Sequence, residues 1–240
     1  MSSDEPERLP RSALEGWSTQ VAPALLGVRL VSELGGARVA VRLTEVEAYM
    51  GEHDPGSHAF RGPTPRTRVM FGPAGFLYVY FTYGMHWCAN VVCGPDGSAS
   101  AVLLRAGEVV QGLDAARARR PAARTDADLA RGPARLTSAL GIDGAQNGAD
   151  LAGCGPLWLE APQEASPASL VRSGPRVGIT GEGASGERFP WRFWLDADPT
   201  VSSYRPGLSR RRLRRRDGIV QTAVAADGGV TTDTTERDET

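Results

Sequence analysis

The sequence predicts one domain of the mixed α/β class, and three observations lead to this prediction. Alternating β-prone runs occur beside separate segments with helical spacing of apolar residues. The hydrophobic content of 41% over 240 residues supports one substantial core. No internal repeat or linker divides the middle of the chain. We therefore expect a domain at 11–204, a disordered lead at 1–10, and an Arg-rich, then acidic, disordered tail at 205–240.

The first part of the domain predicts a helix followed by two strands. Apolar residues recur at helical spacing over 13–26, and strands are expected at 28–34 and 39–49. The second strand carries Glu45 and Glu47 on the same face as its apolar residues, because side chains two positions apart share a face. We expect this strand to leave the core and to end at a cleft.

The remainder predicts a loop, a hairpin, a further strand, helices and two late strands. Gly, Pro and polar residues make 50–75 a loop. The predicted elements are strands at 76–83, 87–93, 99–105, 176–179 and 191–195, a helix at 108–130 broken near Pro121, and a helix that begins at Gly132-Pro133. The hairpin turn falls at Gly84-Met85.

Composition excludes several kinds of chemistry. All 27 basic residues are arginine, so only the N-terminal amine is left as an imine former. Three cysteines without a CxxC pair predict no disulfide framework. The three histidines show no metal-ligand spacing, and the chain has neither a P-loop nor a dinucleotide fingerprint. We expect no metal and no cofactor.

The sequence also bears on the compartment. No apolar run approaches the roughly 20 residues that span a bilayer, so no membrane association is expected. Residues 1–10 are polar and acidic, unlike a signal peptide. Together with the cysteine usage, these features predict a cytoplasmic protein.

The segment at 55–105 combines positive charge with aromatic rings. It contains one acid, Asp96, against four arginines, and it holds eight of the sixteen Phe, Tyr and Trp residues. Arg66 and Arg68, with threonines beside them, suit phosphate oxygens. Tyr83 at the expected hairpin tip suits stacking on a base, which contributes about 1–3 kcal/mol. With Glu47 to activate a water, this pattern indicates chemistry on nucleic acid.

Other interpretations of these residues stay open. Glu45 and Glu47 would lie about 6.6–6.8 Å apart on a strand, which fits the carboxylate pair of an inverting glycosidase. A hydrolase of free nucleosides or other glycosides is therefore a second hypothesis, and a noncatalytic nucleic-acid binder is a third. The basic run at 210–216 is either a nonspecific DNA tether or a soluble tail.

Several short motifs occur in one characteristic order. They are Thr44-Glu45-Val46-Glu47-Ala48-Tyr49, His58, Thr64-Pro65-Arg66-Thr67-Arg68, Tyr78-Val79-Tyr80-Phe81-Thr82-Tyr83-Gly84-Met85, Asn90, Val102-Leu103-Leu104-Arg105-Ala106, Gly132-Pro133-Ala134-Arg135-Leu136 and Arg176-Val177-Gly178. In order and spacing they resemble the alkyladenine (3-methyladenine) DNA glycosylase family, over a span from Leu14 to Tyr204. His86 departs from the pattern, because relatives carry an aromatic residue there.

The resemblance implies roles for the matched residues. Glu47 matches the general base, and Arg105 and the backbone carbonyl of Val177 match groups that help to hold the attacking water. The residues that match the pocket around a flipped purine are Tyr49, His58, Tyr80 and Asn90, the last of which crowds a guanine 2-amino group. Tyr83, with Met85 beside it, matches the hairpin residue that fills the space left by the flipped nucleotide.

The resemblance also implies a fold and a reaction. The fold is a single mixed α/β domain with a curved antiparallel β-sheet, flanking helices and a protruding hairpin that inserts into DNA. The enzyme is monofunctional and excises alkylated or deaminated purines from double-stranded DNA. It needs no cofactor, acts as a monomer, and is associated with the nucleoid through DNA binding. Substrates in this class are 3-methyladenine, 7-methylguanine, hypoxanthine and etheno adducts, and the product is an abasic site.

Overall fold

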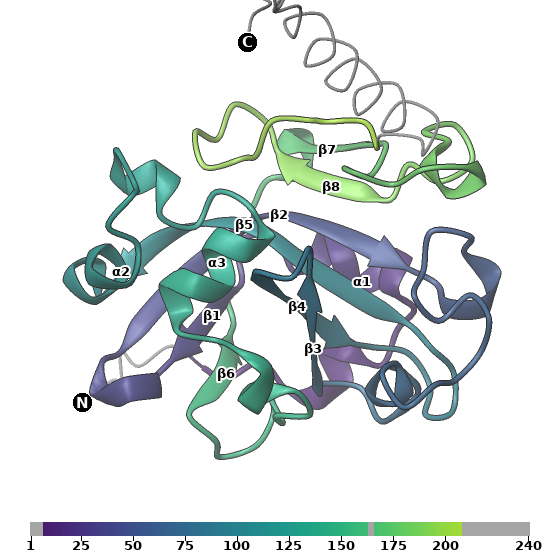
Figure 1. Cartoon of the computed structure of the whole chain (residues 1–240), viewed down its shortest axis with the longest axis horizontal. Coiled ribbons are helices and arrows are strands. Elements are labelled where there is room, and N and C mark those ends of the chain that lie inside the picture. Colours follow the sequence, from purple (N-terminus) through teal and green to yellow (C-terminus); the bar gives the residue numbers. More distant parts are fainter. Residues whose placement is uncertain (1–6, 163–165, 208–240) are drawn as a thin grey trace, which may run out of the picture.

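A curved antiparallel β-sheet organises the protein (Figure 1), seen in a computed structural model that describes residues 7–162 and 166–207. Its eight strands are β1 (Arg29–Ser32), β2 (Val39–Tyr49), β3 (Leu77–Thr82), β4 (His86–Val92), β5 (Ala101–Gln111), β6 (Leu157–Glu160), β7 (Val171–Gly174) and β8 (Arg192–Leu195). Three α-helices accompany them in the described residues: α1 (Ser18–Ala24), α2 (Leu113–Arg119) and α3 (Pro133–Leu140). The predicted single mixed α/β domain with a curved antiparallel sheet is confirmed.

Strand β2 is the centre of the sheet. Strands follow the order β3-β4-β5-β2-β1-β6, and β8 pairs with both β2 and β7. One edge of β2 pairs with β5 along most of its length, while the other edge pairs first with β1 and then, over Glu45–Glu47, with β8. Register shifts near Leu43 and Glu45 interrupt the β2–β5 ladder. Because such bulges bend a strand and increase its twist, the sheet curls where the two carboxylates lie.

The helices cover the sheet with apolar faces. Helix α1 packs on β2 and β5, α3 packs on β4 and β5, and α2 packs on α3. Pro133 starts α3 and Gly141, at φ 74°, ends it, as expected for a proline in the first turn and a left-handed C-terminal glycine. The buried residues of α3 are Leu136, Thr137, Ala139 and Leu140.

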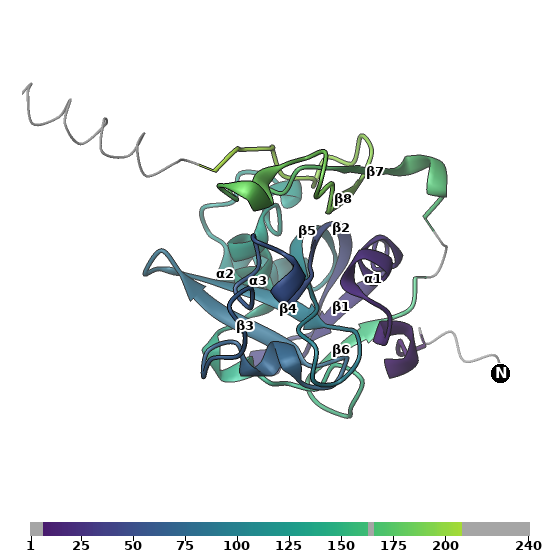
Figure 2. The ribbon, with the colours of Figure 1, turned by 90° about the vertical axis from the view of Figure 1, so that its right-hand side faces the viewer.

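Strands β3 and β4 form a hairpin that leaves the body of the molecule (Figure 2). The Met85 amide donates to the Thr82 carbonyl, and both central residues of this turn, Tyr83 and Gly84, have positive φ, of 52° and 67°. This is the type I′ geometry that matches the twist of a hairpin. The Tyr83 side chain is 84% exposed at the tip, although a non-glycine residue in this region costs about 1–2 kcal/mol.

Two element predictions were wrong, and two short strands were missed. The helix expected at 108–130 is only α2, because residues up to Gln111 continue β5 through pairs such as Val41↔Val109. Residues 176–179 form a turn instead of a strand, because the Arg176 side chain and the Val177 amide bond elsewhere in the fold. The short strands β6 and β7 were not predicted at all.

The ends of the expected domain are described in part. Leu9 donates its amide to the Leu159 carbonyl, so the chain from residue 7 lies along β6. Residues 1–6 and 208–240, which include the basic run at 210–216, lie outside the described residues. Within the described ranges, none of the helices has the length and apolar character required to cross a membrane.

Gly51 allows the chain to turn away from β2 directly after the predicted site residues. Its φ is +51°, and a Cβ there would lie 2.4 Å from the Ala99 carbonyl oxygen.

We expect Gly51→Ala to lower the free energy of unfolding by about 2–5 kcal/mol. The backbone conformation accounts for about 1–2 kcal/mol of this, and the overlap with Ala99 for about 1–3 kcal/mol. Gly97→Ala is the control, since φ is +85° but no atom lies within 4 Å. Equal losses in urea unfolding would contradict the steric argument.

Candidate active site

Glu47 is fully buried near the end of β2 and is held by two hydrogen bonds and one ion pair. The Val177 amide donates to Oε1 at 2.7 Å, and the Tyr49 hydroxyl donates to Oε2 at 2.8 Å. Arg105 Nη1 lies 3.4 Å from Oε1. The structure therefore brings together Glu47, Tyr49, Arg105 and Val177, which lie far apart in the sequence. Val177 reaches Glu47 through its N–H, whereas the resemblance implied a role for its carbonyl.

Glu45 does not share an open cleft with Glu47, contrary to the paired-carboxylate expectation. Its Oε1 accepts from Arg105 Nε at 2.9 Å and Arg192 Nε at 2.7 Å, and its Oε2 accepts from the Ser202 amide at 2.7 Å. Burial by itself would raise the pKa of Glu45, but Arg105, Arg192 and Ser202 outweigh it and lower that pKa below its ordinary value. Glu45 thus acts as a buried anchor for guanidinium groups.

Arg105, on β5, contacts the carboxylates of both Glu45 and Glu47. Burial lowers the pKa of its guanidinium, but the charges of Glu47 and Glu45 more than offset this and raise the pKa above its ordinary value. Two carboxylates thus face Arg105 and Arg192, so the buried charges are balanced. Such balance is required, since an unpaired buried charge costs several kcal/mol.

The Tyr49 ring packs against a further buried arginine, Arg176. The Arg176 guanidinium lies 4.5 Å from the Tyr49 ring centroid, which is a cation–π contact. Burial and the nearby Glu47 charge raise the pKa of Tyr49 well above its ordinary value, so the hydroxyl keeps its proton and donates a hydrogen bond to Glu47. One face of this ring is therefore occupied by Arg176.

Arg176 is fully buried and joins three segments. Its two terminal nitrogens bond Asp54 at 2.5 and 2.6 Å, and they also donate to the Ala48 and Gly183 carbonyls. Its Nε is the one buried side-chain polar atom without a partner among the described residues. This role was not predicted from the sequence, because nothing in the local sequence distinguishes a buried arginine from an exposed one when all 27 basic residues are arginine.

A narrow pocket lies beside Tyr49. Its lining is Tyr49, Gly56, Ser57, His58, Met70, Tyr78, Tyr80, Asn90 and Ile179, around a volume of about 60 Å³. All four residues predicted for the base pocket therefore line one cavity. The volume is below the roughly 300–1,000 Å³ of typical ligand sites, so a bound ring system would have to displace some of these side chains.

The rings within the pocket contact one another. His58 meets Tyr80 edge-on with centroids 4.6 Å apart, and Tyr78 stacks on Tyr80 at 5.6 Å. Burial raises the pKa of Tyr80, and partial burial with the positive charge of Arg66 lowers the pKa of His58. Asn90 donates from Nδ2 to the Tyr78 carbonyl at 3.1 Å, which fixes its amide across the hairpin.

The remaining predicted residues lie around the pocket instead of in its wall. The Arg66 guanidinium is 5.5 Å from the Tyr80 ring centroid, so the predicted phosphate loop reaches the pocket rim. Arg68 begins a 3₁₀ turn on the same loop and is exposed. Tyr83 and Met85, 84% and 67% exposed, stand at the tip of the hairpin whose strands supply Tyr80 and Asn90.

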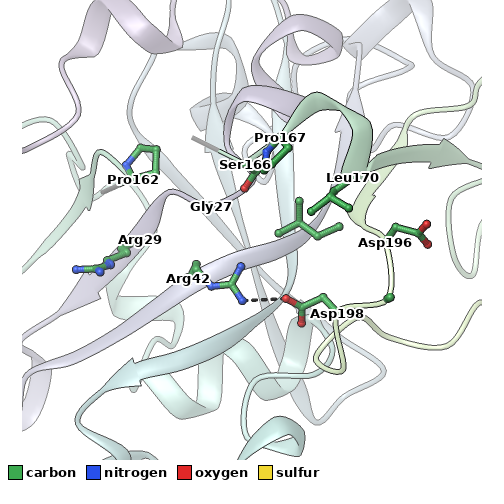
Figure 3. A pocket seen from close by; sticks show the side chains of 11 residues that line it. Gly27, Arg29, Arg42, Pro162, Ser166, Pro167, Leu170, Asp196 and Asp198 are labelled. Carbon is green, nitrogen blue, oxygen red and sulfur yellow. Dashed lines mark hydrogen bonds and ion pairs between the residues drawn. The ribbon is translucent and has the colours of Figure 1, made fainter. Parts of the chain in front are cut away.

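A larger hollow of about 470 Å³ lies elsewhere, between the start of β2 and the turn after β8 (Figure 3). None of the predicted site residues lines it. Arg42 points toward Asp198 and pairs with it at 2.8 Å, and it also pairs with Glu108. The charge of Arg42 is therefore already paired with carboxylates of the protein. No group of three or more potential metal-binding side chains occurs within 7–162 and 166–207.

The Arg176–Asp54 pair supports a stability test. Arg176→Met should lower the free energy of unfolding by about 3–5 kcal/mol, because Asp54 would remain buried without its counter-charge. Asp54→Asn should be destabilising for the converse reason. The double variant should lose clearly less than the sum of the two, as measured by urea unfolding. Strict additivity would show that the two groups do not depend on each other.

Comparison with known proteins shows the family of this chain. The family described as Methylpurine-DNA glycosylase (MPG) matches residues 13–199. A relative from Streptomyces avermitilis is 55% identical over 80% of this chain and 89% of its own, and one from Leifsonia xyli is 53% identical over 85% and 97%. Both carry the name "Putative 3-methyladenine DNA glycosylase". Because the family match covers most of the chain and these relatives are more than 50% identical to it, the chain belongs to the methylpurine-DNA glycosylase family.

Proposed function

We propose that this protein, as a DNA-repair glycosylase, flips a damaged purine out of duplex DNA and hydrolyses its N-glycosidic bond with a water activated by Glu47. The product is an abasic site. The observation that carries the proposal is a buried carboxylate fixed by the Val177 amide and Tyr49, next to an aromatic pocket that Tyr49 itself lines. Residues 11–204 form the catalytic domain and act as a monomer in the cytoplasm.

Glu47 suits the role of general base. An ionised carboxylate has about four lone-pair positions, and the two hydrogen bonds from Val177 and Tyr49 leave room for a water. Arg105 and Val177 hold that carboxylate in one orientation, so the water is positioned against the sugar. As the bond to the base breaks, positive charge develops at the anomeric carbon, and the Glu47 charge stabilises it.

The pocket suits an alkylated or deaminated purine. Extrusion of a nucleotide costs a few kcal/mol and least for a weakly paired base, and stacking returns about 1–3 kcal/mol. A purine held between Tyr49 on one side and His58 with Tyr80 on the other gains this stacking. An N-alkylated purine is positively charged and leaves readily, so a single carboxylate is sufficient. Candidate bases are 3-methyladenine, 7-methylguanine, hypoxanthine and etheno adducts.

The exposed residues supply contacts with the duplex. Tyr83, with Met85 beside it, enters the minor groove and fills the space of the flipped nucleotide, as apolar wedges do in other minor-groove binders. Arg66 and Arg68 contact phosphates. The chain has no lysine, so the N-terminal amine is the one amine that could form an imine with the abasic sugar, and this favours a monofunctional enzyme. A nucleoside hydrolase with paired carboxylates is less well supported, because Glu45 is bonded by Arg105 and Arg192.

The role of Glu47 is tested by Glu47→Gln, which keeps the shape and removes the base. Single-turnover release of hypoxanthine from a duplex should fall by about 10²–10⁴-fold, while the Kd for that duplex changes by only a few-fold. Glu108→Gln, a half-exposed carboxylate on β5, is the control and should retain release. Equal loss of release and binding in Glu47→Gln would count against the assignment.

The role of the hairpin tip is tested by Tyr83→Ala. Loss of one stacked ring should lower kcat/KM on duplex substrate by about 5–150-fold, which corresponds to about 1–3 kcal/mol. Tyr83→Phe should retain most activity, because the ring is kept. Activity on free nucleosides that is unaffected by Tyr83→Ala would instead support a nucleoside hydrolase.

A further inference from the structure

A second polar pocket lies directly beside the catalytic carboxylate. It has a volume of about 350 Å³ and is lined by Arg105, Asp128, Arg131, Arg135, Val177, Ser202, Ser203 and Arg205. Two of these, Arg105 and Val177, are the groups that contact Glu47 Oε1, whereas Oε2 faces Tyr49 in the base pocket. Glu47 therefore separates the two pockets.

The pocket is built on the same backbone as the site. Arg131 forms a bridge with Ala106, the residue after Arg105 on β5, and its Nε donates to the Val201 carbonyl at 3.1 Å. On the opposite side, the Gly178 amide donates to the Arg205 carbonyl at 2.9 Å. The positions of Arg131 and Arg205 are thereby fixed relative to Arg105 and to the segment that carries Val177.

The pocket holds an excess of positive charge. Arg131 and Arg135 share one carboxylate, Asp128, at 3.6 and 3.7 Å, which is beyond the distance of a direct hydrogen bond. The Arg205 side chain is exposed beside them. Three guanidinium groups thus face a single carboxylate, while the charge of Arg105 is already balanced by Glu45 and Glu47.

We propose that this pocket, lined by Arg131, Arg135, Ser203 and Arg205, binds the phosphodiester that flanks the flipped nucleotide. The inference rests on the proposed function. The order base pocket, Glu47, arginine pocket matches the covalent order base, anomeric carbon, phosphate in a nucleotide. Guanidinium groups and a serine hydroxyl donate the hydrogen bonds that phosphate oxygens accept.

The first test measures salt dependence. For the binding of a hypoxanthine-containing duplex, the slope of log K against log salt concentration should become smaller by about 0.9 in Arg135→Ala and in Arg205→Ala. Arg135→Lys should keep the wild-type slope, because it keeps the charge. Arg8→Ala is the matched control and should leave the slope unchanged. Arg8 is exposed, and its backbone pairs with Glu160 on β6, at the opposite edge of the sheet from the hairpin.

The second test identifies the phosphate. A neutral methylphosphonate in place of the phosphate next to the lesion should weaken wild-type binding, and it should have little further effect in Arg135→Ala or Arg205→Ala.

Additive losses of binding, or salt slopes in Arg135→Ala and Arg205→Ala equal to that of Arg8→Ala, would overturn the assignment of this pocket even if the wild-type protein releases hypoxanthine. If adding inorganic phosphate weakens Arg135→Ala binding as much as wild-type binding at constant ionic strength, the effect is not specific to the pocket, and the assignment also fails. Absence of base release by the wild type would instead overturn the proposed function.

Discussion

The candidate site depends on one buried carboxylate that is satisfied by donors from three separate parts of the chain. Tyr49 comes from the same strand as Glu47, Arg105 comes from the neighbouring strand β5, and Val177 comes from the segment after β7. A buried carboxylate without such donors costs several kcal/mol. The burial of Glu47 therefore requires that all three parts are in place, which couples the geometry of the site to the fold of the sheet and of the late segment.

Arginine is the side chain that makes this arrangement possible. Arg105 bonds one carboxylate and approaches another, and Arg176 bonds both oxygens of Asp54 and two carbonyls while it lies against the Tyr49 ring. A planar group with five donors can do this, whereas a lysine ammonium offers a point charge with three. The interior of the site is thus a network of flat cations between carboxylates and aromatic rings.

The sequence predicted the parts of the fold that have a local cause. The alternation of β2, the hairpin turn and the proline at the start of α3 each follow from nearby residues. The extension of β5 beyond residue 105 was missed because pairing with β2 overrides the helix preference of that segment. The roles of Asp54, Arg176 and Ser202 were missed for a related reason: each depends on a partner more than 100 residues away, and spacing along the chain contains no information about such partners.

The hairpin tip has a consequence for the free protein. Tyr83 holds a left-handed backbone conformation and presents its ring to water, with 84% of the residue exposed. Neither feature favours the unliganded fold, and a glycine would relieve the backbone strain of about 1–2 kcal/mol. Selection for stability alone would therefore replace this tyrosine. The tip therefore carries an exposed aromatic ring on a strained backbone position, at a cost in the stability of the free protein.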